Sequence, residues 1–345
     1  MPNGASLHDR LLAALLDAPN VSDVLLVARL DDPRIGHPDV QDMRVFVPDL
    51  HLLTRRDEAR YAYGFNCKPQ LIGVLKGLKA FRRGLAGGES LAVYQLGDYL
   101  DLWRQGTNDA TPILEEHFDI HGHLYGSPSA LNAWFLLGNH DVELPSSGGF
   151  QVWNRRYYFP IRDPRVLVTH GDVFDWKERF PDAFNRLYVY MFGPMYDSTA
   201  YDLETLQRTV KASHGRKQYR QYIQAEYHDL ADSVSVAAGL PGGPAWNVGR
   251  VTDPDDRSAH EFLPAAYRST QDIQADFGLG LTMVVIGHTH HARIAVYEGA
   301  GGEFFALMDC GAWIERYRTP ADPEPHPNAQ IGVMAGNDCR IYQIV

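Results

Sequence analysis

Apolar residues occur along the chain mainly in short runs, and each run ends at a cluster of polar residues. Runs of four to eight apolar and β-branched residues between polar turns predict buried strands. We therefore expect strands at 43–48, 91–96, 132–137, 165–169 and 282–286. Apolar residues at helical spacing predict helices at 9–17, 69–82 and from about Asp109 to Phe118.

The order of strand, polar loop and helix repeats three times between residues 43 and 141. This pattern predicts a layered α/β domain whose functional loops gather at the carboxyl ends of the strands. Strands at 292–297 and 303–308 and a final hairpin near 331–345 are expected to complete a second sheet. We found no internal repeat.

The predicted organisation has three parts. Residues 1–42 form an N-terminal helical and extended segment, and residues 43–345 form the main domain. The long stretch at 173–281 has mostly helical patterning and is expected to form an inserted helical cap.

Five of the predicted strands end in residues that bind metals. Carboxylate, amide and imidazole groups, with no thiolate, favour a transition metal such as Mn, Fe, Zn or Ni over an all-oxygen Mg or Ca site. Seven such residues would suffice for two ions that share one carboxylate, that of Asp98. The candidate ligands are Asp49, His51, Asp98, Asn139, His170, His288 and His290.

The composition and charge limit the kinds of substrate that the protein is expected to bind. The 345 residues are 45% hydrophobic and 22% charged, which suits one large globular domain with or without a cap. A formal charge of −11 disfavours nucleic acid, because that binding relies on Lys and Arg against phosphates. Bound cations would reverse the field locally and attract a small phosphorylated substrate.

The remaining features predict a cytoplasmic protein. Cys67, Cys310 and Cys339 are scattered and form no CxxC pair, so we expect a reducing compartment. The first twenty residues lack the pattern of a secretory signal, and no apolar run reaches the roughly 18 residues that span a bilayer. Peripheral membrane contact and the oligomeric state stay open.

The motifs DLH, GDYLD, GNHD, HGD and GHTH, in this order and at strand ends, resemble those of the calcineurin-like metallophosphoesterases. The resemblance covers residues 43 to about 315 and leaves the cap unmatched. It implies an α/β (α+β) fold, a four-layer αββα sandwich of two mixed β-sheets flanked by helices. It also implies two divalent ions, with Mn as the first expectation.

The resemblance further implies a role for each matching residue. Asp49, His51, Asp98 and His290 would hold the first ion, and Asp98, Asn139, His170 and His288 the second. A hydroxide bridging the ions would attack phosphorus in line and cleave a phosphoester or pyrophosphate bond. His140 would protonate the leaving oxygen, Asp101 would orient His140, and Asp141 and Asp172 would orient ligands.

The substrate stays open. DLHL, GDYLDLW and HGD are similar to the UDP-2,3-diacylglucosamine pyrophosphatases, but that family carries Arg in place of His140 and has a shorter insertion. A phosphodiester such as a cyclic nucleotide is the other candidate. Leu52 and Leu102-Trp103 replace the Gly and Arg-Gly of protein Ser/Thr phosphatases, which disfavours that activity. A catalytically silent scaffold and a nuclease are further alternatives.

Several residues have a structural interpretation beside a functional one. We interpret His117, His121 and His123 as a solvated connector, and Asp309-Cys310-Gly311 as a turn. His291 either contacts substrate or faces outward. The aromatic stretch 180–201 either packs the cap or lines a groove for lipid chains. Five basic side chains could bind phosphate oxygens, although such side chains are more often simply exposed to solvent. They are Lys177, Arg179, Arg186, Arg155 and Arg156.

Overall fold

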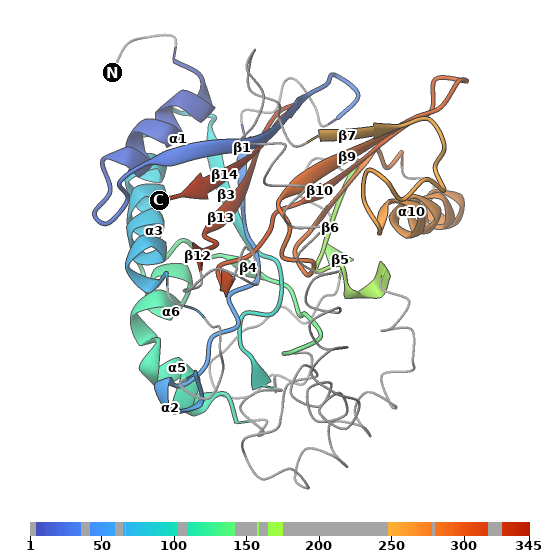
Figure 1. Ribbon diagram of the computed structural model, residues 1–345. Coiled ribbons are helices and arrows are strands. Elements are labelled where there is room, and N and C mark those ends of the chain that lie inside the picture. The colour runs from blue at the N-terminus through green and yellow to red at the C-terminus, as the bar shows by residue number, and fades with distance from the viewer. Residues whose placement is uncertain are drawn as a thin grey trace, which may run out of the picture.

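The computed structural model describes most of the chain outside the predicted cap. The described residues are 5–35, 42–58, 65, 67–102, 109–141, 157–158, 165–174, 248–277, 280–316 and 326–345 (Figure 1). The stretch 180–201 and the five basic residues just named lie outside these ranges.

Two six-stranded mixed sheets form the centre of this mixed α/β protein. The first has, in spatial order, the strands β1 (Val24–Asp31), β14 (Asp338–Ile344), β13 (Gln330–Ala335), β2 (Asp42–Val47), β3 (Ser90–Gln95) and β4 (Trp134–Phe135). β2, β3 and β4 run parallel, whereas β13 is antiparallel to β2. Since parallel strands end at one edge, the loops after β2, β3 and β4 lie together.

The second sheet is built in the same way. Its spatial order is β5 (Tyr157–Tyr158), β6 (Val166–Thr169), β8 (Met283–Ile286), β10 (Phe304–Asp309), β9 (Arg293–Glu298) and β7 (Val248–Val251). β6, β8 and β10 are parallel, so their loops also share one edge. A separate pair joins β11 (Glu315–Arg316) to β12 (His326–Pro327).

The described helices are α1 (Leu7–Leu16), α2 (Arg55–Glu58), α3 (Lys68–Arg83), α5 (Thr111–Glu116), α6 (Phe118–Leu124), α10 (Leu263–Phe277) and the 3₁₀ turn η1 (Asp172–Phe174). Three of them, α1, α3 and α5, lie where the sequence predicted helices at 9–17, 69–82 and about 109–118. Ser6 and Asp9 form a capping box that begins α1. None of the described helices is both long and apolar enough to cross a membrane.

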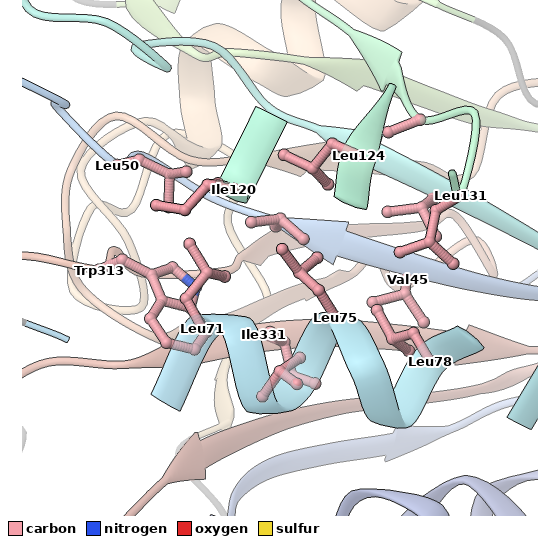
Figure 2. Packing of buried hydrophobic residues seen from close by; sticks show 14 of the residues in the cluster. Val45, Leu50, Leu71, Leu75, Leu78, Ile120, Leu124, Leu131, Trp313 and Ile331 are labelled. Atoms are coloured by element: carbon pink, nitrogen blue, oxygen red, sulfur yellow. The ribbon is translucent and has the colours of Figure 1, made fainter. Parts of the chain in front are cut away.

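Alternating side chains place each sheet between two apolar cores. In β2, Met43 and Val45 pack with α1 and α3, whereas Phe46 points to a core shared with the second sheet. In β8, Val285 joins that shared core and Val284 packs with α10. Figure 2 shows the core beside α3, where Leu71, Leu75 and Leu78 face Val45 and Ile331 among 14 of its residues.

The strand pairing corrects one expectation. The final hairpin, β13 and β14, completes the first sheet rather than the second, because β13 pairs with β2 and β14 with β1. The pairing also places Val24–Asp31 inside the first sheet. The predicted N-terminal segment 1–42 is therefore joined to the main domain through β1 and through the contact of α1 with α3.

The C-terminal part of the predicted cap belongs to the second sheet. β7 pairs in parallel with β9, and α10 contacts β10. The expected insertion at 173–281 is thus too long at its C-terminal end. Residues 175–247, which remain for a cap, lie outside the described ranges, so their helical structure stays a prediction.

The connector with three histidines is helical, which corrects the expectation of a solvated loop. His117 is buried between α5 and α6, and its Nε2 donates to the carbonyl of Leu53 at 2.8 Å. His121 and His123 lie on α6, half-buried, while Ile120 and Leu124 of the same helix enter the core. Their function is packing, and no metal group of the described residues includes them.

Candidate metal centre

The seven predicted ligands meet where the carboxyl edges of the two sheets adjoin. The loops after β2, β3 and β4 supply Asp49, His51, Asp98 and Asn139, and the loops after β6 and β8 supply His170, His288 and His290. Backbone bonds tie the first two loops together, since the amides of Leu50 and His51 donate to the Asp98 carbonyl at 3.1 and 2.8 Å.

Four of the candidate ligands have left-handed backbone conformations. His51 and Asp98 have φ of 48°, His288 has 67° and His290 has 61°. They make up four of the six non-glycine residues with positive φ in the described chain. Such strain persists only where the surroundings hold it, and it clusters at functional sites.

Two glycines let backbone approach the carboxylates. A Cβ on Gly138 would overlap Oδ1 of Asp98, and a Cβ on Gly287 would overlap Oδ1 of Asp49. The same carboxylates accept backbone N–H groups: His140 N lies 2.9 Å from Asp98 Oδ1, and His288 N lies 3.0 Å from Asp49 Oδ2. Both carboxylates are therefore fixed with oxygens facing the centre.

The first group surrounds one point with donor atoms. His51 Nε2 lies 3.1 Å from His290 Nε2 and 3.5 Å from Asp98 Oδ2. Asp49 Oδ2 lies 3.1 Å from His290 Nε2 and 3.8 Å from His51 Nε2. The arrangement brings together the four residues that the resemblance assigned to the first ion.

The second group surrounds a neighbouring point. His170 Nε2 lies 3.0 Å from Asn139 Oδ1, 3.1 Å from His288 Nδ1 and 3.4 Å from Asp98 Oδ2. Asp98 Oδ2 thus approaches ligands of both groups, as expected for a shared carboxylate. All seven predicted ligands are brought together. Three overlapping sets of described residues could each hold a metal ion: Asp49, His51 and His290; Asp98, His170 and His288; and His51, Asp98 and His140, the last of which includes the predicted proton donor.

The hydrogen bonds fix two imidazoles so that lone pairs point at the centre. His51 Nδ1 lies 3.1 Å from Asp101 Oδ2, and His170 Nδ1 lies 3.0 Å from the Leu96 carbonyl. Both partners accept, so both Nδ1 atoms donate and neutral rings expose a lone pair at Nε2. A second ring nitrogen bonded to a carboxylate or carbonyl is typical of metal-ligating histidine.

The distances between donors also suit a metal. Ligands about 2.1 Å from an octahedral ion lie roughly 3.0 Å from one another at right angles. Most of the spacings among the atoms above, 3.0 to 3.5 Å, agree with this value, and the separation of Asp49 Oδ2 from His51 Nε2 is longer at 3.8 Å. Lone pairs and carboxylates that crowd around one point repel each other until a cation is bound.

The titration of the centre reflects the same demand for positive charge. Burial alone would lower the pKa of His170, but the carboxylates of Asp98 and Asp49 outweigh it and raise that pKa well above its usual value. Burial alone would raise the pKa of Asp98, but His170 and His140 outweigh it and lower that pKa well below its usual range. The field that favours a proton here also favours a metal cation.

His140 and Asp101 lie beside the first group. His140 Nδ1 is 2.9 Å from Asp101 Oδ1, and the fully buried Asp101 also accepts from His51 through Oδ2. One carboxylate thereby orients both a candidate ligand and the predicted proton donor. The side chain of His140 is 18% exposed and that of His290 21%, whereas His51 and His170 are at 2% and 0%. The centre therefore opens to solvent on the side of His140 and His290.

Asp141 and Asp172 are both buried next to the ligands. Asp141 accepts the amides of Gly138 at 2.7 Å and Tyr99 at 2.8 Å, so it links the loops that carry Asn139 and Asp98. Burial and the nearby Asp98 raise the pKa of Asp141 to about 8. Asp172 begins η1, two residues after His170, and contributes to raising the His170 pKa.

From the sequence, we assigned no role in the site to several residues around the GHTH motif, which spans His288 and His290. Asp309 is fully buried and accepts from Thr289, which stands between His288 and His290. Asp309 ends the apolar strand β10, and from the sequence we interpreted it as part of a turn rather than of the site. His260 and Phe262, which also reach this motif, carry no comparable signal. His291 is half-buried, and its amide donates to Thr289 Oγ1 at 3.3 Å.

Comparison of the chain with known protein-family models gave no match, and comparison with curated proteins gave none.

Proposed function

We propose that the protein is a phosphohydrolase that uses two divalent transition-metal ions, in the manner of the calcineurin-like metallophosphoesterases that its motifs resemble. The observation that carries the proposal is the pair of donor groups that share Asp98, with neighbouring donor atoms 3.0 to 3.8 Å apart. Asp49, His51, Asp98 and His290 would hold one ion, and Asp98, Asn139, His170 and His288 the other. Mn is the first choice, with Fe, Zn or Ni as alternatives.

When bound, two such ions supply polarisation of the phosphoryl oxygens and a lowered pKa for the attacking water. The remaining chemistry belongs to the chain. His140, on the open side of the centre, donates a proton to the leaving oxygen of an in-line displacement. Its Nδ1 is bonded to Asp101, so the ring presents Nε2 to the substrate, and Asp101 stabilises the charged form of His140 between turnovers.

The fold supports the same assignment. Three apolar cores alternate with the two sheets, one beside α1 and α3, one between the sheets and one beside α10. These cores favour a four-layer αββα sandwich. Residues 175–247 would form a helical cap inserted into this sandwich, since this stretch lies between η1 and β7 in the sequence.

The substrate is a small phosphoester or a nucleotide-diphospho compound. The charge of −11 disfavours a nuclease, and His140 in place of Arg separates the site from the UDP-2,3-diacylglucosamine pyrophosphatases. A catalytically silent scaffold of the same fold is the second candidate. The hydrogen bond between His140 and Asp101 argues against a scaffold, because an oriented proton donor is needed for catalysis and not for binding a protein partner.

Hydrolysis by metal-free protein supplied with Mn, Zn, Ni or Mg one at a time tests the proposal. Bis(p-nitrophenyl) phosphate and p-nitrophenyl phosphate serve as diester and monoester. We expect turnover only with added metal, and loss of turnover in Asp98→Asn. Absence of hydrolysis with every metal, despite metal uptake by the wild-type protein, would favour the scaffold.

A further inference from the structure

A chain of buried polar groups stands behind the turn that carries His288 and His290. Thr289, between the two histidines, donates its hydroxyl to Asp309 Oδ2 and accepts the His291 amide at 3.3 Å. Asp309 ends β10 at the register of Ile286, the last residue of β8, so its carboxylate lies beside the turn. Its Oδ1 also accepts the Gly311 amide at 3.2 Å.

His260 completes this chain from a different part of the sequence. Its Nε2 lies 3.0 Å from Asp309 Oδ2, and both residues have no exposed surface. Its Nδ1 accepts the Phe262 amide at 3.0 Å, so the hydrogen of a neutral ring is on Nε2 and is donated to Asp309. Burial, with Arg293 and His291 nearby, lowers the pKa of His260 well below its usual value, which agrees with a neutral ring.

The segment of His260 contacts the turn a second time. The ring of Phe262 stacks on that of His288, with centroids 5.8 Å apart and planes at 25°. The turn is thus held by Asp309 through Thr289 and by Phe262 through His288. It needs this support, because His288 and His290 both have left-handed φ, which side chains with a Cβ adopt at a cost.

We propose that Asp309, held by His260, is a positioning residue that fixes the Thr289 turn and thereby aims the imidazoles of His288 and His290 at two different metal positions. The inference rests on the proposed metal centre. Asp309 and His260 touch neither substrate nor metal, so they act through Thr289. Residues of this kind typically change metal affinity by about 10- to 100-fold when they are replaced.

The test compares Thr289→Val with Thr289→Ser. Valine has the shape of threonine but no hydroxyl, whereas serine keeps the hydroxyl, so serine should restore what valine loses. Thr270→Val is the matched control, because the Thr270 hydroxyl donates to the Tyr267 carbonyl within α10. Asp309→Asn and His260→Gln test the other two residues of the hydrogen-bonded chain that begins at Thr289. Thermal unfolding of each metal-free variant confirms that it folds.

Two measurements are made on the full chain. Titration with Mn²⁺ alone should show dissociation constants about 10- to 100-fold higher for Thr289→Val and Asp309→Asn, and wild-type values for Thr289→Ser and Thr270→Val. Histidine-labelled metal-free protein should show shifted imidazole NMR signals for His288 and His290 in the first two variants only.

The outcomes separate the two proposals. Wild-type Mn²⁺ affinity in Thr289→Val, or unmoved imidazole signals, would overturn the positioning role while leaving the proposed hydrolase intact. If the imidazole signals shift but the wild-type protein takes up neither Mn²⁺ nor Fe²⁺, Zn²⁺ or Ni²⁺, the turn is positioned as described and the proposed metal centre is wrong.

Discussion

His140 and Asp101 form a partly buried hydrogen bond of 2.9 Å between Nδ1 and Oδ1, and the second oxygen of Asp101 accepts His51 Nδ1 at 3.1 Å. The predicted proton donor and a predicted metal ligand are therefore held by one carboxylate. Replacing His140 should therefore separate proton transfer from metal binding, whereas replacing Asp101 should affect both.

His140→Ala should keep its metal and lose turnover. Removing a general acid costs about 10²- to 10⁴-fold in rate, and the loss should be larger for an alkyl leaving group than for p-nitrophenolate, which needs no proton. Mn²⁺ titration and kcat for both leaving groups measure the effect, with His123→Ala on α6 as control. Loss of Mn²⁺ together with activity would make His140 a ligand instead.

Asp101→Asn should impair both functions. The amide has one accepting oxygen where the carboxylate has two, so in each of its orientations one of His51 and His140 faces a donor and loses its partner. Exchange between the two orientations would loosen both rings. We expect Mn²⁺ affinity to fall by about 10- to 100-fold and kcat at saturating Mn²⁺ to fall as well. Recovery of the full kcat once Mn²⁺ is saturating would show that Asp101 serves His51 alone.

Metal should stabilise the fold measurably. At free Mn²⁺ 100 times the dissociation constant, one occupied site adds about 2.7 kcal/mol to the free energy of unfolding. Asp98 faces both groups, so Asp98→Asn should lose most of this gain. Urea unfolding with and without Mn²⁺ gives the numbers, and an equal gain in the variant would contradict the shared role of Asp98.

Gly138→Ala should disable the centre through a single methyl group. The added Cβ would overlap Asp98 Oδ1 and displace the carboxylate that both groups use. Hydrolysis and Mn²⁺ uptake should both drop. Gly122→Ala on α6 is the matched control, because a Cβ there meets nothing within 4 Å and alanine favours helix. Normal Mn²⁺ uptake by Gly138→Ala would show that Asp98 is not needed where the structure places it.

Stability should fall in acid partly through Asp338. Burial alone would raise the pKa of Asp338, but hydrogen bonds from Arg340 and Arg29, with the charge of His8, lower it. A lowered carboxyl pKa in the folded state adds stability that is complete above the unfolded value near 3.8 and is lost as the pH falls toward the folded pKa. Asp338→Asn should therefore be about 1 kcal/mol less stable at pH 7 in urea unfolding. The difference should shrink below pH 4, and a gap of constant size would exclude the ionic explanation.

Much of the centre could be predicted because its residues follow local apolar runs. Asp49, Asp98, Asn139 and His170 each stand where a buried strand ends, and short strands are visible in the sequence itself. A motif of three or four residues at such a position predicts where its side chain lies. Asp309 also stands at the end of a buried strand, but we interpreted Asp309-Cys310-Gly311 as a turn and gave Asp309 no role in the site.

The pairing of strands that are far apart in the sequence could not be predicted. β1 pairs with β14 from the opposite end of the chain, Val24 opposite Ile344, and no local pattern records that choice. The final hairpin was assigned to the wrong sheet for the same reason. His117 to His123 look polar, yet Ile120 and Leu124 are enough to fold them as a helix against the core.

Because the centre is divided between two sheets, it can form only late in the synthesis of the chain. Asp49 and His290 lie 3.1 Å apart in space and 241 positions apart in sequence. A nascent chain exposes Asp49 early but cannot close either donor group until His288 and His290 have left the ribosome. The complete set of donors therefore forms only after nearly complete synthesis, and every truncated product that stops before this point lacks it.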